Sequence, residues 1–172
     1  GRGRRPATMR SFPGAWVLPG GGVDAVFELN VLDRDADVDI ASQDGRTPLF
    51  FACQMGRLRA ATLLLDRGAD VNRPKLDGET PLLVACDNNH VDVARLCLDR
   101  GAHVDAVQEH GFTPLHCAAI AGHESLAMHL LNCGAQIDAK DKRGRTAARW
   151  ASIRGHKELA AKLKPPKGGE KY

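Results

Sequence analysis

Apolar residues in the middle of the chain are grouped in short segments, and each segment is followed by a glycine. After Gly56, for example, Leu58, Ala61, Leu64 and Leu65 are spaced so that they share one side of a helix. Segments of this kind end at the glycines of positions 68, 101 and 134. The pattern predicts short amphipathic helices that stop at a glycine.

These segments recur with a fixed period of 33 residues. The period places glycine at positions 45, 78, 111 and 144, threonine at 47, 80, 113 and 146, alanine at 52, 85, 118 and 151, and histidine at 90, 123 and 156. A regular internal repeat indicates a stack of one small unit, because a unit of this length cannot bury its apolar side alone.

Each repeat contains signals for two helices and a turn. A threonine, which can cap a helix, precedes a residue at the first helical position, and in three repeats that residue is proline (Pro48, Pro81 and Pro114). About seven residues later a residue that tolerates a positive φ reverses the chain; these residues are Gly56, Asn89, Gly122 and Gly155. Between helix pairs, a β-branched residue, polar residues and a turn glycine predict a hairpin loop.

The period and the motif Thr-Pro-Leu-His-x-Ala, complete at positions 113–118, resemble those of the ankyrin-repeat family. The resemblance implies an all-α solenoid of stacked antiparallel helix pairs with β-hairpin loops, over residues 23–164. Other repeats depart from the motif. Phe50, Leu83 and Arg149 replace its histidine, and Ala147 replaces its proline in the last repeat.

We expect the ends of the chain to differ from the regular repeats. Pro19 and the glycines at 20–22 fall where a first helix would lie, and an interior proline costs about 3 kcal/mol there. A partial repeat with one helix near 23–34 is therefore expected, and Lys157, Lys162 and Lys164 give the last repeat the polar outer face of a cap. The predicted divisions are a basic, mobile segment 1–22, a partial repeat 23–43, repeats 44–76, 77–109 and 110–142, a capping repeat 143–164, and a basic tail 165–172.

Composition and charge narrow the functional classes. The net charge is +3, with four arginines and no acidic residue in the first 22 positions. Only 5% of residues are aromatic, which disfavours a nucleic-acid platform based on base stacking. No apolar run approaches the roughly 20 residues of a membrane helix, so we expect no membrane insertion. Five cysteines without a CxxC pair favour free, buried thiols and a location in the cytoplasm or nucleus.

The sequence contains no readable catalytic site. We find no HExxH motif, no phosphate-binding loop and no cysteine nucleophile with a neighbouring base, so we expect no enzyme activity, metal or cofactor. The repeat explains His90, His123 and His156 as structural hydrogen-bonding residues. His129 occupies a position that is leucine in two other repeats and is expected to be partly buried, and Trp150 is expected to face the neighbouring repeat in the core.

The resemblance implies a partner-binding concave face formed by hairpin tips and by the exposed sides of the first helices. Its residues run from acidic through apolar to basic along the chain. Phe112 is either an anchor for a partner or a packing residue within the domain, and both alternatives stay open here. The predicted binding residues are Arg46, Met55, Leu76, Asp77, Glu79, Asp87, His110, Phe112, Ile120, Lys142, Arg143, Arg145 and Arg154.

We therefore predict a monomeric, non-catalytic module that binds another protein. One alternative is that the chain, which opens on Gly1 and not on methionine, is the substrate-recognition part of a larger enzyme such as a ubiquitin ligase or a kinase. Another is that the basic tails bind nucleic acid or an anionic surface. The resemblance further suggests that Asn72 is hydroxylated by a dioxygenase, and a plain hairpin role for Asn72 is the other interpretation.

Overall fold

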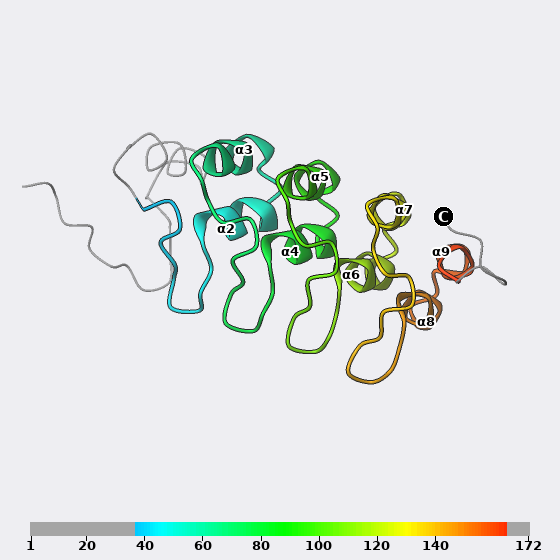
Figure 1. Ribbon diagram of the computed structural model, residues 1–172. Helices are drawn as coiled ribbons and strands as arrows, with labels where there is room; N and C mark the ends of the chain where they lie inside the picture. The colour runs from blue at the N-terminus through cyan, green and yellow to red at the C-terminus, as the bar shows by residue number, and fades with distance from the viewer. Residues whose placement is uncertain (1–36, 165–172) are drawn as a thin grey trace, which may run out of the picture.

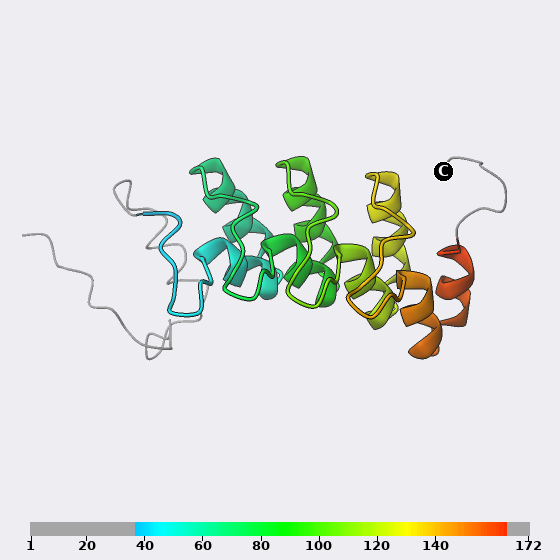
Figure 2. The same ribbon diagram turned by 60° about the horizontal axis from the view of Figure 1, so that its bottom comes forward.

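The computed structural model describes residues 37–164, which form a row of helix pairs (Figures 1 and 2). The first helices of the pairs are α2 (Pro48–Gln54), α4 (Pro81–Asp87), α6 (Pro114–Ala121) and α8 (Ala147–Ile153). The second helices are α3 (Leu58–Asp66), α5 (Val91–Asp99), α7 (Glu124–Asn132) and α9 (Lys157–Lys162). Within residues 37–164 the chain has no strand apart from one β-bridge between Lys140 and Thr146. The predicted all-α repeat solenoid is confirmed.

The first helices begin where the sequence predicts. In α2 the side-chain oxygen of Thr47 accepts a hydrogen bond from the backbone N–H of Phe50 at 3.2 Å. Thr80, Thr113 and Thr146 cap α4, α6 and α8 in the same way. In α2, α4 and α6 a proline follows the cap, where its missing N–H costs no helical hydrogen bond.

The turns between helices depend on residues with positive φ. The residues that close the first helices have φ values of 67° at Gly56, 58° at Asn89, 78° at Gly122 and 88° at Gly155. Among the described residues, Asn89 is the only residue other than glycine with a positive φ. Asparagine tolerates this conformation better than most side chains, so the sequence-based assignment of Asn89 to the turn is confirmed.

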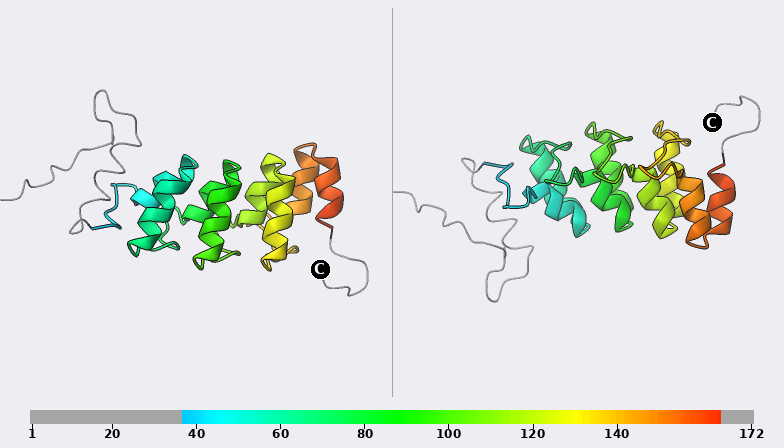
Figure 3. Two further views of the ribbon diagram at one scale, coloured as in Figure 1. Left: turned by 90° about the horizontal axis from the view of Figure 1, so that it is seen from above. Right: turned by 90° about the horizontal axis from the view of Figure 1, so that it is seen from below.

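The core runs along the whole stack because the first helices pack against one another in order. Figure 3 shows, from above and from below, that the helix pairs follow one another in a single row. Alanines at the equivalent positions Ala52, Ala85, Ala118 and Ala151 are fully buried. Their small side chains allow neighbouring first helices to approach closely, so the burial of each repeat depends on its neighbours.

The cysteines are all free thiols, but they are not all buried. Cys53, Cys86, Cys97 and Cys117 lie in the core, and Sγ of Cys53 lies 3.6 Å from Sγ of Cys97 in the next repeat. Burial raises the pKa of the Cys86 thiol well above its usual value, so this thiol stays protonated. Cys133 is exposed, which corrects the expectation of buried thiols at this position.

The hairpin loops are linked from one repeat to the next. Each loop is closed by a backbone hydrogen bond, as between the N–H of Lys75 and the carbonyl of Glu79 at 2.9 Å. Three further bonds join successive loop tips: from Leu76 N–H to Asp44 O, from Glu109 N–H to Asp77 O and from Lys142 N–H to His110 O. These bonds fix the spacing of the loop tips along one side of the stack.

Several predictions concern residues outside the described range. The basic segment 1–22, the expected helix near 23–34 and the tail 165–172 all lie outside residues 37–164. The predicted domain boundaries therefore stay predictions. Of the partial repeat 23–43, the structure describes residues 37–43, which form turns before the first complete repeat.

Candidate partner-binding surface

The predicted binding residues occupy two kinds of position in the stack. Those on the linked hairpin loops are Arg46, Leu76, Asp77, Glu79, His110, Phe112, Lys142, Arg143 and Arg145. Those at the C-terminal ends of the first helices are Met55, Asp87, Ile120 and Arg154. None of these side chains is buried. We refer to this set, together with Ile153 at the end of α8, as the inner face.

In the first complete repeat the charge of Arg46 is already satisfied. Its Nε donates to a carboxylate oxygen of Asp44 at 2.5 Å, and its guanidinium lies 4.8 Å from the centre of the Phe51 ring. The hydroxyl of Ser42 also donates to Asp44 at 2.5 Å. This hydrogen bond, followed by those from Arg46, lowers the pKa of Asp44. Arg46 is therefore half of a local ion pair on the loop.

On the next hairpin loop one lysine pairs with two of the predicted acidic residues and offsets one of their two negative charges. Nζ of Lys75 lies 3.1 Å from a carboxylate oxygen of Asp77 and 2.8 Å from one of Glu79. Burial alone would raise the pKa of Asp77, but the N–H of Glu79 and the ammonium of Lys75 lower it. Sequence reasoning missed Lys75, although it lies two residues before Asp77. The acidic part of the inner face is consequently weaker than the sequence suggests.

Phe112 packs inside the domain. Its ring centre lies 5.6 Å from that of Trp150 in the next repeat, with an edge-on geometry, and 5.9 Å from that of His116. A further edge-on contact at 6.4 Å joins Phe112 to His110. These contacts favour the packing alternative for Phe112. They also show that Trp150 faces the neighbouring repeat as expected. Trp150 is only half-buried and lies outside the buried core, which corrects its assignment to the core.

Arg145 is held against the domain by Asp141 and Trp150. The guanidinium lies 3.8 Å from the centre of the Trp150 ring, and its Nη2 lies 3.0 Å from Oδ2 of Asp141. The indole N–H of Trp150 donates to the same oxygen at 2.9 Å. Nε of Arg145 donates to this oxygen as well, at 3.1 Å. A planar guanidinium can stack on a ring and direct two N–H groups at one acceptor at the same time, which a lysine ammonium cannot. Arg145 is thus a packing residue as much as a surface residue.

Asp141 is the centre of this cluster, and sequence reasoning did not single it out. Its side chain is only 1% exposed. Burial would raise its pKa, but hydrogen bonds from the N–H groups of Arg145 and Arg143 and from the Trp150 indole lower it to about 2. A buried charge needs such donors, and they explain why a carboxylate is accepted at this position.

The three repeated histidines are structural, as predicted. Nε2 of His90 donates to the carbonyl of Gln54 at 3.1 Å, and Nε2 of His156 donates to that of Ile120 at 3.2 Å. The corresponding distance from His123 to Asp87 O is 3.4 Å. His129 is half-buried as expected, and its Nε2 lies 3.7 Å from Sγ of Cys133.

A family comparison agrees with the repeat architecture. A family model for ankyrin repeats (three copies) matches residues 19–108 and 104–171. The chain belongs to the ankyrin-repeat family. Ankyrin repeats are generally protein–protein interaction modules and are typically non-catalytic. A search of curated proteins gave no match.

Neither a metal cluster nor a membrane helix occurs in the described ankyrin repeats. Across positions 37–164, no three side chains of histidine, cysteine, aspartate or glutamate come together in a way that could hold a metal ion. Over the same positions, every helix is too short or too polar to cross a bilayer.

Asn72 joins two successive ankyrin repeats. Its Oδ1 accepts the backbone N–H of His103 at 2.8 Å, and its Nδ2 donates to the carbonyl of Gly101 at 3.1 Å. At the equivalent position of the preceding repeat, Asp39 accepts the N–H of Asp70. Asn72 is a structural bridge in the described contacts, and its hydroxylation stays a prediction.

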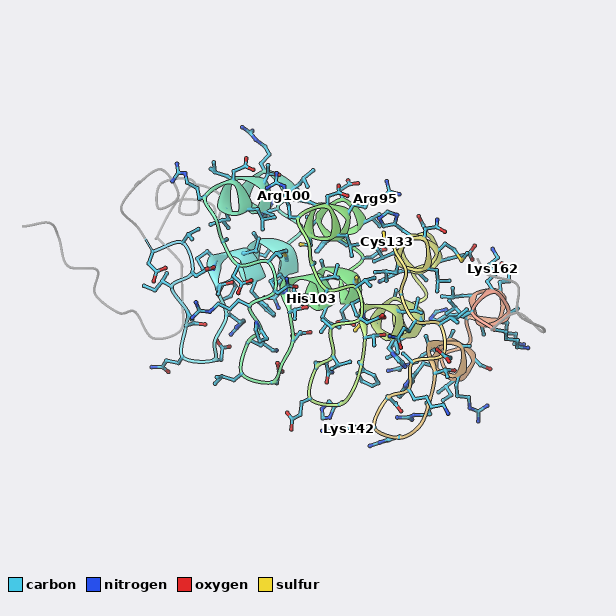
Figure 4. All side chains as sticks on the ribbon, in the orientation of Figure 1. Arg95, Arg100, His103, Cys133, Lys142 and Lys162 are labelled. Carbon is cyan, nitrogen blue, oxygen red and sulfur yellow. The ribbon has the colours of Figure 1, made fainter. Side chains whose placement is uncertain are left out.

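The last ankyrin repeat carries charges that are not neutralised. Lys142 and Arg143 on its hairpin and Arg154 at the end of α8 are exposed, and none of them forms an ion pair within the described part of the chain. Figure 4 shows Lys142 at the tip of the last hairpin, on the opposite side of the stack from Arg95. Apolar side chains are also exposed on the inner face, with Leu76 81% exposed and Ile153 50% exposed.

Proposed function

We propose that this ankyrin-repeat chain is a non-catalytic module that binds another protein through its inner face. The observation that carries the proposal is the exposure of Leu76, an apolar side chain at the tip of a hairpin that is tied to its neighbours. Apolar residues on the surface of a stable domain are common singly, but an apolar residue on a rigid, ordered loop offers burial to a partner at low cost.

The linked loop tips support the proposal because they pre-organise the surface. Association costs free energy for every flexible group that becomes ordered. Backbone hydrogen bonds between successive loop tips remove part of this cost before a partner arrives. Leu76, Met55, Ile120 and Ile153 then supply apolar contact, and the charged residues set the orientation of the partner.

Phe112 and Arg145 have a different role in this proposal. Their contacts with Trp150 and Asp141 hold the hairpin against the next repeat, so they shape the inner face. Substituting them would alter packing as well as binding. A test of the binding surface should therefore use exposed residues without such contacts.

Affinity capture from cells with quantitative mass spectrometry tests the proposal. We expect Leu76→Glu and Ile153→Glu each to lose the proteins that the wild-type chain captures, because each places a charge where apolar contact is proposed. Leu58→Glu is the matched control, since Leu58 is 41% exposed on the second helix α3. The inner face would be excluded as the binding surface if both inner-face variants still captured the partners, or if only Leu58→Glu lost them.

The proposal includes a monomeric protein in the cytoplasm or nucleus. Light scattering of the purified chain tests the oligomeric state, and imaging of a tagged chain in cells tests the location. Membership of a larger enzyme is tested by the complete open reading frame. Binding of RNA through the basic tails would appear as a steep salt dependence that disappears when residues 1–22 and 165–172 are removed.

A further inference from the structure

We propose that the protein partner presents an acidic segment with apolar residues, and that this segment docks on the last repeat. The docking site is the cationic cluster of Lys142, Arg143 and Arg154, with Ile153 beside it. This inference rests on the proposed function and specifies the chemistry of the partner.

The cluster differs in its pairing from the cations of the preceding hairpin loops. Arg46 is neutralised by Asp44, and Lys75 is neutralised by Asp77 and Glu79. Lys142, Arg143 and Arg154 are exposed and make no ion pair with the described residues. Like charges on one small repeat raise the local positive potential, which attracts an anionic group and orients its approach.

The cluster runs along a single repeat. Lys142 and Arg143 lie in the hairpin, and Arg154 directly follows α8, the helix that the hairpin leads into. The seven residues of α8 span about 10 Å at the rise of an α-helix. An extended peptide advances about 3.3 Å per residue, so a segment of several residues can contact both ends of the cluster.

The chemistry of the surroundings favours a polypeptide over a nucleic acid. The ring of Trp150 lies within the last repeat, but the guanidinium of Arg145 covers it at 3.8 Å. A base therefore cannot stack on that face of the ring, and stacking is a main source of affinity for single strands. In the preceding repeats, Glu109 and Asp87 are exposed and unpaired among the described residues. They would repel any anionic ligand that extends along the inner face, so they confine the acidic segment to the last repeat.

The exposed side chain of Ile153 sets a second requirement for the partner, which is an apolar residue beside its acidic residues. Ile153 is 50% exposed and precedes Arg154 in sequence. A partner with only acidic residues would leave Ile153 in water. A partner that alternates acidic and apolar residues can bury Ile153 and pair with Arg154 at the same time.

Fluorescence anisotropy with the full chain tests the proposal. The probe is a fluorescein-labelled 15-residue peptide of glutamate and leucine, and its control has glutamine in place of every glutamate. The test variant combines Lys142→Glu, Arg143→Glu and Arg154→Glu. The control variant combines Arg59→Glu, Arg95→Glu and Lys157→Glu, which changes the net charge by the same amount at exposed residues of α3, α5 and α9.

We expect the test variant to weaken binding of the glutamate peptide by at least about tenfold and the control variant by less than about twofold. The difference should shrink as salt is raised, because exposed charges are screened. Far-UV circular dichroism of both variants shows whether the fold persists. Equal weakening by the two variants, or equal affinity for the glutamine peptide, would overturn the proposal.

A 15-nucleotide single-stranded RNA serves as the competing ligand. Tighter binding of this RNA than of the peptide, lost in the test variant alone, would assign the cluster to phosphate and overturn the acidic-peptide proposal. The proposed function fails separately, when Leu76→Glu and Ile153→Glu both leave cellular capture unchanged. A different result would overturn only the acidic docking. In that case Leu76→Glu and Ile153→Glu lose cellular capture, but the test variant changes neither capture nor peptide binding.

Discussion

The imidazole of His156 lies so close to Gly122 that a Cβ atom on Gly122 would lie 2.5 Å from its Cε1. The same relationship joins His90 to Gly56, where a Cβ atom would lie 2.4 Å from Nδ1. In both cases the ring also donates to a carbonyl of the preceding repeat. Glycine is therefore required here for two reasons, the positive φ of the turn and the space taken by the next repeat.

A pair of substitutions separates these two requirements. Gly155 has a positive φ of 88°, like Gly122 at 78°, but nothing lies within 4 Å of its Cβ position. We expect Gly155→Ala to cost about 1 kcal/mol of unfolding free energy for the left-handed conformation alone. Gly122→Ala should cost about 2 to 3 kcal/mol, because His156 must also move. Urea unfolding measures both, and equal costs would show that the imidazole contact contributes nothing.

At Asn89 the substitution can be made in the opposite direction, from a residue with a side chain to glycine. Its φ is 58°, and the next histidine along, His123, makes the longest of the three equivalent hydrogen bonds, at 3.4 Å. Asn89→Gly removes the conformational strain and the Cβ atom, and we expect a gain of about 0.5 to 1 kcal/mol in unfolding free energy. Thermal unfolding of the variant beside the wild-type chain measures this gain. A lower melting temperature would contradict the expectation.

Asp141 should control acid stability through its hydrogen bonds. Its folded pKa of about 2 lies below the usual 3.8, so the stability it contributes is complete above about pH 3.8 and is lost as the pH falls through about 2. We expect Asp141→Asn to cost about 2 kcal/mol at neutral pH, because the amide leaves donors from Arg145 and Trp150 poorly satisfied.

The control for Asp141 is Asp138→Asn. Asp138 lies in the same loop, is exposed and has no hydrogen bond among the described residues. It should change the unfolding free energy by less than about 0.5 kcal/mol. The difference between the two variants should narrow in acid. A difference that stays constant down to about pH 2 would show that the ionised carboxylate is not the stabilising group.

His116 is expected to make stability depend on pH near neutrality. Burial lowers the pKa of His116 below 6.5, although hydrogen bonding to the carbonyl of Arg145 and the charge of Asp141 oppose this. The unfolded chain therefore binds a proton at a higher pH than the folded chain, and stability falls as the pH drops below about 6.5. His116→Leu, which copies Leu83 of the preceding repeat, removes this titration.

Urea unfolding of the wild-type chain and His116→Leu at about pH 7.5 and about pH 5 tests the role of His116. At the higher pH we expect the leucine variant to lack the hydrogen bond from His116 Nε2 to the carbonyl of Arg145, which is 3.0 Å long. At the lower pH the wild-type chain should lose more stability than the variant. Parallel losses in the two proteins would assign the pH dependence to other groups.

Substitutions of Asn72 test both its hydrogen bonds between repeats and its predicted hydroxylation. Asn72→Asp keeps the acceptor for His103 N–H but loses the donor to Gly101 O, and Asn72→Ala loses both. We expect the alanine variant to cost about 1 to 2 kcal/mol and the aspartate variant less. If Asn72 is hydroxylated in cells, the intact mass of the wild-type chain should include a species heavier by one oxygen atom that Asn72→Ala lacks. Absence of that species would remove the hydroxylation hypothesis.

The regular part of the fold could be predicted from the sequence because it depends on local rules that recur. Thr47 caps α2, and Gly56 and Asn89 turn the chain, for reasons that can be stated without the structure. The position of His90 in the repeat also predicted its hydrogen-bonding role. The family match and the helix positions agree with these predictions.

The charge pattern of the inner face could be predicted only in part. The 33-residue repeat assigns Arg145 to a hairpin loop. It does not predict that the long side chain of Arg145 packs on Trp150 and pairs with Asp141. In the same way, Lys75 neutralises Asp77 across the loop, which depends on side-chain geometry and not on the period. Long side chains with many rotamers choose their partners in three dimensions, so the unpaired cluster became visible only in the structure.

The open space above Gly155 has a consequence for engineering. At Gly56 and Gly122 the equivalent space holds the imidazole of the following repeat, and among the described residues Gly155 has no such neighbour. In a designed additional repeat, a histidine equivalent to His156 could place its imidazole in this open space. Lys157 at the start of α9 would be the side chain to exchange first. It is equivalent to Glu124, which pairs with Lys162 of the following repeat, so an added module would bring Lys157 out of water.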